Sequence, residues 1–309
     1  MQYTQKLKIT LSVSAAIILV GMAIGLLGGG MNVGVDFTGG TIVTIQFANP
    51  DFDMSVVDAA LAANDAVGAQ TVRTGNTTSY QDMANIRMKN LGDDMAENAQ
   101  RTAILETIKE TYPAAQITSI DRVDGVASKS LIQNAIFSVL IASVLILVYI
   151  WIRFELLSGI AAVLCLLHDV MVMVALTCML RIPINSPFIA AVLTIVGYSI
   201  NNTIVVFDRV RENSGNKAYA EKNRAEIVNK SISGTLRRSI NTSLTTLITI
   251  SMVYILGVES IKEFSLPIII GLIAGTYSSV FLAGPLWARW HIMRYEKMKH
   301  NTPSKKKAK

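Results

Sequence analysis

Apolar residues along this chain are gathered in long blocks with few polar interruptions. Most of these blocks contain about 20 residues, which is the length of α-helix that crosses the hydrocarbon core of a bilayer. They lack the alternating spacing of apolar and polar positions that is typical of a soluble fold. The pattern therefore predicts six membrane-spanning helices, at residues 9–27, 131–151, 157–180, 188–207, 239–257 and 265–288.

Residues 31–128 follow a different pattern, with short elements of mixed type. Within 41–47, Val43, Ile45 and Phe47 share one face, which predicts a half-buried strand. The predicted elements are, in order, a strand at 41–47, a helix at 55–65, strands at 69–74 and 82–89, a helix around 101–112 and a strand at 116–123. This βαββαβ order is the ferredoxin-like pattern.

Charge is distributed unevenly between the parts of the chain. Residues 31–128 carry 13 Asp or Glu against 6 Lys or Arg, whereas residues 208–238 and 289–309 carry eight basic side chains each. Basic segments stay on the cytoplasmic side of a membrane. With six spans, both termini are then expected inside and residues 31–128 outside. For the lysine-rich tail, anionic lipid is the expected partner and nucleic acid is not.

The first apolar block follows Lys6 and Lys8, as the core of a secretory signal would. It is longer than a typical signal core, and no A-x-A-like cleavage site follows it. We therefore expect a retained first span.

Composition agrees with this organisation, since 51% of the residues are hydrophobic and 16% are charged. The chain is predicted to be an α-helical membrane protein with six transmembrane helices and a small α+β ferredoxin-like extracytoplasmic domain. The expected divisions are 1–30 for the cytoplasmic N-terminus and first helix, 31–128 for the outer domain, 129–290 for the other five helices, and 291–309 for a basic cytoplasmic tail.

Polar residues within the spans are the candidates for function. On a helix with 100° per residue, Thr194, Tyr198, Asn201 and Asn202 fall in one arc of the fourth span, and Arg238, Thr242, Thr245 and Thr249 fall in one arc of the fifth. Two simpler interpretations remain open. The threonines can bond to their own helix or hold helices together, and Arg238 can extend to the cytoplasmic surface.

His168 and Asp169 lie near the middle of the third span. A carboxylate at this depth is costly and by default marks a functional site, although a hydrogen-bonded structural role for Asp169 is the alternative.

Four motifs together resemble the SecF family, whose six-span members work with SecD beside the bacterial protein-export channel: GVDFTGG (34–40), HDV (168–170), GYSINNTIVVFDRVREN (197–213) and LRRSINTS (236–243). The resemblance implies the fold of the resistance-nodulation-division exporters and use of an ion gradient to draw secreted proteins outward. It also implies a bacterial inner-membrane location and SecD as partner. Further implied partners are the SecY/SecE/SecG translocon, translocating preproteins, YajC and YidC.

The same resemblance implies an intramembrane ion-coupling network, made here of Asp169, Tyr198, Asn201, Asn202, Arg238 and Thr242. Position 202 matches a carboxylate of the family's Asn-Asp pattern, yet this chain has Asn-Asn. An amide cannot release a proton. Asn202 could therefore hydrogen-bond to Arg238 while a carboxylate of the partner or Asp169 titrates, or it could bind sodium.

The signature after the first span comprises Gly34, Asp36, Gly39 and Gly40. The glycines are expected to form turns, and Asp36 and Thr38 to make local hydrogen bonds.

Three alternatives to an export subunit remain. A small-molecule or ion exporter of the same superfamily usually has larger outer domains and both halves in one chain. An intramembrane enzyme on Ser199, or on His168 and Asp169, would need a nucleophile and base pair that neither position forms locally. A structural scaffold would not need ionisable Arg238 or Asp169. We expect the chain to have no enzymatic activity, no cofactor and no metal site.

Overall fold

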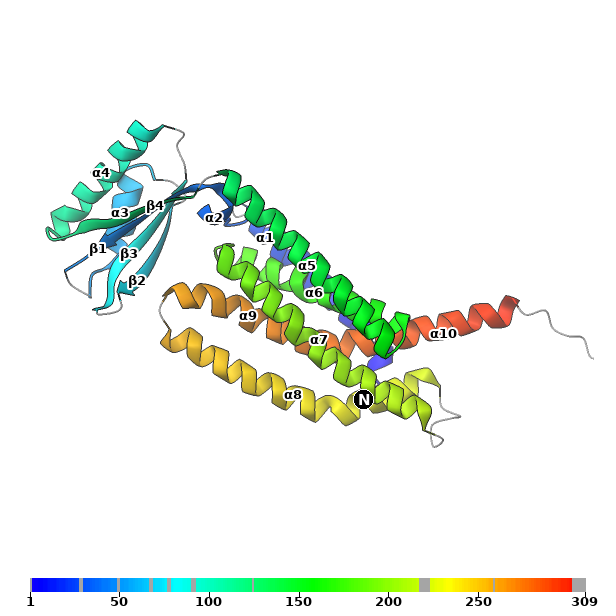
Figure 1. Ribbon diagram of the computed structural model, residues 1–309. Coiled ribbons are helices and arrows are strands. Elements are labelled where there is room, and N and C mark those ends of the chain that lie inside the picture. The colour runs from blue at the N-terminus through cyan, green and yellow to red at the C-terminus, as the bar shows by residue number, and fades with distance from the viewer. Residues whose placement is uncertain are drawn as a thin grey trace, which may run out of the picture.

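The structure is a computed structural model that describes residues 2–27, 30–48, 51–66, 69–76, 79–89, 93–123, 125–216, 223–257 and 259–301. A bundle of long helices forms one part, and a four-stranded sheet with two helices lies at one end of that bundle (Figure 1).

Six helical segments are long and apolar enough to cross a membrane, as the sequence predicted. They comprise α1 (Leu7–Leu27) with the preceding η1 (Tyr3–Lys6), α5 (Gly125–Arg153), α6 (Leu156–Met179), α7 (Ser186–Gly215), α8 (Arg224–Leu256), and a last span built from α9 (Glu259–Ser278), the π-helical η3 (Ser279–Ala283) and the start of α10 (Gly284–Asn301). Both α7 and α8 extend well past the predicted apolar blocks. Their charged ends continue the helix because Lys, Arg and Glu are good helix formers.

The six spans are not equivalent in burial. Half or more of α6, α7 and the last span is buried, against 11% of α5 and of α8. Gly271 and Gly275 of α9 lie against Ile195 and Ser199 of α7, where an added Cβ would come within 2.5 Å of Ile195 and 3.0 Å of Ser199. This small-xxx-small spacing lets the two helices approach closely. The centre of the bundle is therefore the contact between α6, α7 and α9.

The sheet contains β1 (Gly40–Gln46), β2 (Gln70–Asn76), β3 (Ser79–Lys89) and β4 (Gln116–Val123) in the spatial order β2-β3-β1-β4. All three strand pairings are antiparallel, and Val43 lies opposite both Ile86 and Ile120. With α3 (Met54–Ala63) after β1 and α4 (Asp94–Thr111) after β3, the predicted βαββαβ order is confirmed.

One face of this sheet is covered by α3 and α4 (Figure 1). Val43, Ile45 and Phe47 of the predicted apolar face are each at most 2% exposed, and they pack in one core with Val57 of α3 and Ile108 of α4. The alternation in residues 41–47 therefore identified the buried side of the strand correctly.

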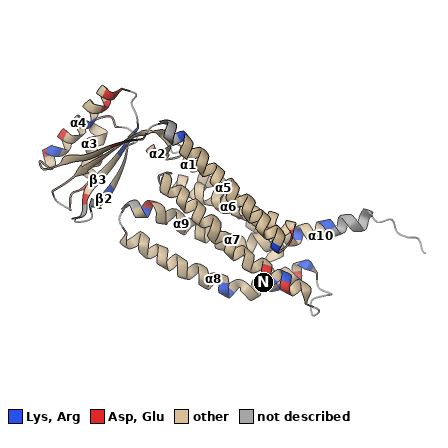
Figure 2. Ribbon diagram, in the orientation of Figure 1, with Lys and Arg blue, Asp and Glu red and all other residues tan. Residues whose placement is uncertain are grey.

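Charged side chains gather at the two ends of the molecule, and the length of the bundle between them carries few (Figure 2). Acidic residues are seen mainly on the sheet domain, and basic residues at the opposite end, near η1 and α10. The separation predicted from the sequence is thus a separation in space.

Candidate functional site

Asp169 is the centre of a buried polar cluster. Its side chain is fully buried, and its Oδ2 accepts hydrogen bonds from Ser199 Oγ of α7 (2.5 Å) and Ser278 Oγ of α9 (2.8 Å). His168 Nδ1 lies 2.9 Å from Asp169 Oδ1. These four residues, which we call the Asp169 cluster, join the three helices at the centre of the bundle.

Local backbone geometry brings these groups together. Gly275 lies against Ser199, so α9 approaches α7 closely enough for Ser278, one turn later, to reach the same carboxylate. Ser278 also directly precedes η3, the π-helical turn of Ser279–Ala283. Single π-helical turns are rare in α-helices and are frequent at functional sites.

Asn202 belongs to a second buried cluster, one turn further along α7. It is 2% exposed, and its Nδ2 donates to Ser243 Oγ of α8 at 3.2 Å. Thr276 Oγ1 of α9 lies at hydrogen-bond distance, 2.8 Å, from the same Ser243 oxygen. We call these three residues the Asn202 bridge. The contact expected between Asn202 and Arg238 is not formed among the described residues.

The polar arc predicted on the fourth span is divided by the structure. Tyr198 is half-buried between α7 and α8, and its hydroxyl contacts the carbonyl of Thr242 (2.9 Å) and Thr246 Oγ1 (3.0 Å). Asn201 is exposed, although Asn202 beside it is buried. Ser199 was not part of the predicted arc, yet it is buried. The buried face of α7 therefore contains Ser199 and Asn202 rather than Asn201.

Arg238 lies on a face of α8 that points away from the rest of the chain. It is exposed, as are Thr245 and Thr249, while Thr242 is half-buried. These four residues form the α8 stripe. Thr245 Oγ1 bonds to the Thr242 carbonyl (2.9 Å) and Thr249 Oγ1 to the Thr245 carbonyl (3.0 Å), so both threonines bond to their own helix. Within the described parts of the chain, Arg238 forms no ion pair.

The signature after α1 lies against the start of α7. Asp36, in the short helix α2 (Val35–Thr38), accepts a hydrogen bond from the backbone N–H of Ser186 at 2.9 Å, and Gly34 N donates to the Ile184 carbonyl at 2.8 Å. A local bond is found for Thr38, whose hydroxyl lies 3.3 Å from the Gly34 carbonyl, whereas the bond of Asp36 reaches a residue 150 positions away. A carboxylate at a helix N-terminus satisfies a free N–H and the helix dipole.

Gly39 and Gly40 form the turn into β1, as predicted. Their φ angles are 73° and 156°, which side-chain-bearing residues rarely adopt. A Cβ on Gly40 would also lie 2.2 Å from the Met88 carbonyl oxygen of β3. The glycines therefore allow the chain to enter the sheet directly after α2.

An ion pair connects the sheet to the helices. Glu263 of α9 is 8% exposed, and both of its carboxylate oxygens lie 3.0 Å from Arg87 Nη1 of β3. Asn185 Nδ2 donates to Glu263 Oε2 at 2.6 Å, while Asn185 Oδ1 caps α7 at Phe188 N. This pair was not predicted from the sequence. The one available signal was an acidic residue at the edge of an apolar block.

The polar end of α7 carries two ion pairs within the motif at 197–213. Arg209 pairs with Glu212 at 2.6 Å and Arg211 with Asp208 at 3.1 Å. Both pairs are exposed and join residues one turn apart, so they help to hold the helix beyond its apolar part.

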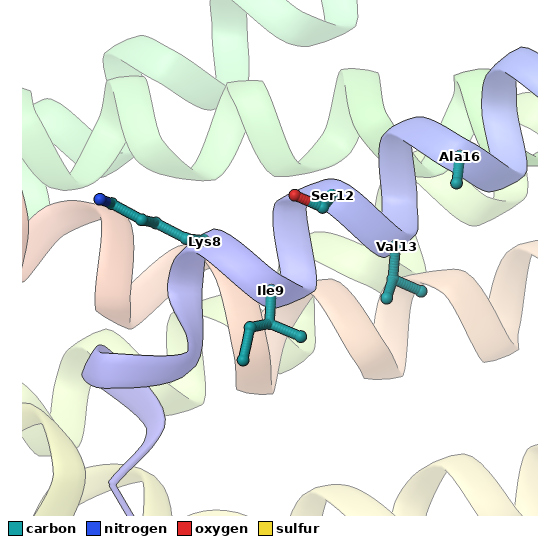
Figure 3. Close-up of a pocket in the computed structure, with 5 residues that line it drawn as sticks. All are labelled: Lys8, Ile9, Ser12, Val13 and Ala16. Atoms are coloured by element: carbon teal, nitrogen blue, oxygen red, sulfur yellow. The ribbon is translucent and has the colours of Figure 1, made fainter.

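A surface hollow and the acidic, cysteine and histidine residues were also considered as binding sites, and neither forms one among the described residues. A hollow of about 390 Å³ along α1 is lined by Lys8, Ile9, Ser12, Val13 and Ala16 (Figure 3). All five come from one face of one helix, which cannot enclose a ligand by itself. Among the described residues there is also no group of three or more His, Cys, Asp or Glu side chains placed to hold a metal ion.

Two family descriptions match this sequence. "Protein export membrane protein SecD/SecF, C-terminal" matches residues 103–293, and "SecD/SecF GG Motif" matches residues 24–51. The longer match contains Asp169, Asn202 and Arg238, and the shorter one contains Gly39 and Gly40.

Relatives with assigned names match over most of the chain. The sequence is 35% identical to protein translocase subunit SecF of Sebaldella termitidis, over 83% of this chain and 81% of that one. It is 36% identical to protein translocase subunit SecF of Desulfurispirillum indicum, over 91% of this chain and 89% of that one.

Crystal structures of SecDF share the fold. That of SecDF from Thermus thermophilus has a TM-score of 0.76 at 30% identity and covers 94% of this chain. SecDF in a super-membrane-facing form has a TM-score of 0.71 at 31% identity and covers 97% of this chain. The chain spans 39% and 40% of the length of those two SecDF chains.

Proposed function

The chain belongs to the SecD/SecF family of protein-export membrane proteins, and from this premise we propose that it works with a SecD-type partner to couple an ion gradient to late-stage protein translocation. Its SecF relatives are subunits of protein translocase, and they match it along most of both sequences. The alternative of a small-molecule or ion exporter has no such support.

The need for a partner is supported most directly by the α8 stripe. A cation in a membrane helix is costly unless it is paired or hydrated, by about 2.5–3.5 kcal/mol at the bilayer centre and by less toward the ends of a span. Arg238 is exposed, and no counter-ion reaches it from the described residues. The chain also matches 37% of the length of a relative from Thermus thermophilus, whose name, SecDF, combines SecD and SecF. A SecD-type bundle packed on α8 would supply the missing groups.

We assign the coupling site to the Asp169 cluster and the Asn202 bridge, with Tyr198, Thr242, Asn201 and Arg238 facing the partner side. Asn202 cannot titrate, and its amide is used to hold α7 against α8. Asp169 can titrate, and its carboxylate is held by hydroxyls from two other helices, so a change in its charge would be felt by α6, α7 and α9 together. Asp169 is therefore the proton-carrying group of this chain.

The sheet is proposed to be a ferredoxin-like domain on the extracytoplasmic side. Its strand order and antiparallel pairing agree with that fold. The basic end of the bundle, opposite the sheet, favours cytoplasmic termini. Arg87 and Glu263 would then join the outer domain to the last span, so that movement of the helices is passed to the domain.

The chain is proposed to be non-catalytic. In a hydrolytic triad the imidazole lies between the serine and the carboxylate. Here the Asp169 carboxylate lies between Ser199 and His168, and no hydrogen bond joins Ser199 to the imidazole within the described residues. The nucleophile thus lacks its base within the described residues.

The wider partners are also proposals. These are the SecY/SecE/SecG translocon, the translocating preprotein, YajC and YidC, together with anionic lipid at the basic tail. Membership of an export family supports the first two, and the eight basic residues of 289–309 support the lipid.

Export from reconstituted vesicles tests the proposed function. The full chain would be combined with its SecD-type partner and the translocon, and export measured under a proton gradient alone and a sodium gradient alone. We expect the proton gradient to drive export and Asp169→Asn to abolish it, with Cys178→Ser as the matched control in the same helix. Export driven equally by sodium, or retained by Asp169→Asn, would reject proton coupling through Asp169.

A further inference from the structure

A groove of about 440 Å³ runs along the outside of the bundle between α8 and α9, with η1 at one end. We propose that it binds one acyl chain of an anionic phospholipid, whose headgroup lies beside Lys6 and Lys8. The inference goes beyond the proposed coupling role and does not depend on it, because it concerns the surface that the chain turns toward the bilayer.

The walls of the groove are apolar and open to the outside. Ile240 and Leu244 of α8 are 46% and 50% exposed, and Ile273 of α9, on the other wall, is 57% exposed. Tyr277 and Phe281 complete this second wall, with their rings 5.4 Å apart. An apolar side chain on the outside of a membrane span faces lipid tails, which are as apolar as leucine. The groove is therefore open to an acyl chain from the surrounding bilayer.

Polar atoms in the groove already have partners within the chain. Ser243 and Thr276 line it, and their hydroxyl oxygens lie 2.8 Å apart in the Asn202 bridge. The Tyr277 hydroxyl donates to the Thr10 carbonyl at 2.9 Å. Water needs two to four polar partners to stay in a cavity, and apolar cavities remain dry. The chemistry of these walls therefore suits hydrocarbon and not water.

The groove and the α8 stripe lie on opposite faces of α8. On a helix with 100° per residue, Leu236, Ile240, Leu244 and Leu247 of the groove fall within an arc of about 80°, and the centre of the stripe lies about 180° from the centre of that arc. A partner that covers the α8 stripe would therefore leave the groove facing lipid.

The dimensions of the groove favour a single extended chain. From Leu236 to Leu247 the helix rises about 16 Å, which is about half of the hydrocarbon core and thus the depth of one leaflet. With the open space at its mouth included, the groove holds about 990 Å³. Over that length the mean cross-section is about 60 Å², whereas a helix about 10 Å across needs about 80 Å². The groove is too narrow to seat a helix of a partner.

Basic side chains stand at one end of the groove. Tyr3 lines the groove, and Lys6, three residues later in the 3₁₀-helix η1, falls on the same side of that helix. Two hydrogen bonds of 3.1 Å between Thr4 and Asn229 hold η1 against α8. Lys6 and Lys8 are exposed, form no ion pair among the described residues, and belong to the basic end of the bundle (Figure 2). Such cations attract the anionic headgroups of a membrane surface.

An acyl chain in this position would pack directly against the Asn202 bridge, since Ser243 and Thr276 belong to both. Only 11% of α8 is buried within the chain. Packing contacts rather than hydrophobic burial hold helices together inside a membrane. The bound lipid would therefore add contacts that keep α8 beside α9.

Photo-crosslinking of the full chain with its SecD-type partner in vesicles tests the proposal. The probe is phosphatidylglycerol with a diazirine in its acyl chain, and adducts are mapped by mass spectrometry. Adducts on the groove walls at Leu244 and Ile273 should exceed those at Leu140 of α5, which is 53% exposed, by at least about threefold, because the lysines concentrate anionic lipid there. Equal adducts at all three positions would overturn the proposal. Fewer adducts in the groove would show that the partner or a second copy covers it, which also overturns the proposal.

The headgroup is tested with a phosphatidylethanolamine probe that carries the same acyl chain. The excess of adducts in the groove should fall with this probe, and it should also fall for phosphatidylglycerol when Lys6→Gln and Lys8→Gln are combined. An excess that is equal for both headgroups would reject the role of the two lysines. Neither measurement uses export, so the result is independent of proton coupling through Asp169.

Filling the groove provides a second test. Leu244→Trp should remove the excess of phosphatidylglycerol adducts at Ile273. The matched control is Ile248→Trp, because Ile248 is 53% exposed one turn further along α8 and does not line the groove. Retention of the excess in Leu244→Trp, or its loss in both variants, would contradict binding in the groove. If Leu244→Trp does not assemble with the partner, the comparison of positions 244, 273 and 140 in the unmodified complex decides alone.

Discussion

The Asp169 cluster and the α8 stripe are both rows of polar side chains inside membrane helices, and they are satisfied in opposite ways. Ser199 and Ser278 reach across from two neighbouring helices to one carboxylate. In the α8 stripe, Thr245 and Thr249 bond to their own helix and Arg238 is exposed. The Asp169 carboxylate is therefore satisfied by groups within this chain, whereas Arg238 has no ion-pair partner among the described residues.

The two arrangements predict different effects of a substitution on the stability of the chain. Removing a group from a completed network leaves its former partners buried and unbonded, so it should lower the stability of the chain itself. Removing a group from the α8 stripe should leave the chain stable and affect only export. Four substitutions, ordered by their expected effect on stability, test this distinction.

Glu263→Gln should have the largest effect on stability, about 2–3 kcal/mol in the free energy of unfolding, because it leaves the Arg87 cation at 14% exposure without its counter-ion. The measurement is thermal or denaturant unfolding of the purified chain in detergent. The matched control is Asp94→Asn, which breaks an ion pair with Arg122 whose side chains are 76% and 50% exposed. Exposed pairs contribute about 0–1 kcal/mol.

The Asp94 control also has its own pH signature. A hydrogen bond and the charge of Arg122 lower the pKa of Asp94, so this pair contributes at neutral pH and is lost as the pH falls through the carboxyl pKa. If Glu263→Gln lowered the free energy of unfolding no more than Asp94→Asn at neutral pH, the Arg87–Glu263 pair would act as a surface contact rather than a buried link.

Asp169→Ala should lower stability by about 2 kcal/mol, since two buried hydroxyls and one imidazole nitrogen lose their acceptor. Asp169→Asn should cost less, because the amide oxygen still accepts a hydrogen bond. Unfolding of both variants in detergent checks this order. Equal stability of Asp169→Ala and the parent would mean that the cluster is not a completed network.

Asn202→Ala should cost about 1 kcal/mol, the usual contribution of one hydrogen bond, because it removes the link from α7 to Ser243 of α8. Asn202→Asp introduces a titratable group beside Ser243 and should add a new step to the pH dependence of export. The measurement is export over a range of pH with sodium present and absent. If both variants match the parent throughout, the Asn202 bridge has neither a structural nor a coupling role.

Arg238→Gln should change the stability of the isolated chain by less than about 0.5 kcal/mol, as exposed substitutions usually do. It should insert and co-purify with the partner and yet fail in proton-driven export. Arg237→Gln is the control, because Arg237 is also exposed and lies next to it. Normal export by Arg238→Gln would make this residue a surface anchor, and a loss of stability would place it in a network within the chain.

Local patterns were sufficient for the elements of this fold. The six apolar blocks predicted the spans, and the alternation of Val43, Ile45 and Phe47 predicted the buried face of β1. The spans follow from the length of the apolar blocks. The buried face of β1 follows from periodicity, because a strand that buries one side must repeat its apolar residues at every second position. The predicted hydrogen bond of Thr38 was correct for a similar reason, since its partner is four residues away.

Contacts between helices were not accessible from such patterns. A span that has three neighbours has more than one inward side, so the arc containing Asn201 and Asn202 did not show which of the two is buried. The same ambiguity led Ser199 to be placed apart from the polar residues, although it contacts Asp169 at 2.5 Å. Ser278, in turn, is one of many small residues in the last span, and its spacing gave no sign of a role.

The sequence by itself determined the number of spans, the order of elements in the sheet domain, the separation of charge and the family, because each of these depends on residues that are close together in the chain or on motifs in series. Only the tertiary structure decided which polar residues meet. Asp36 bonds to Ser186 across 150 positions and Arg87 pairs with Glu263 across 176. Such contacts depend on how the helices are rotated and how closely they pack. At Gly275 and Ser199 that packing is set by the absence of a single Cβ.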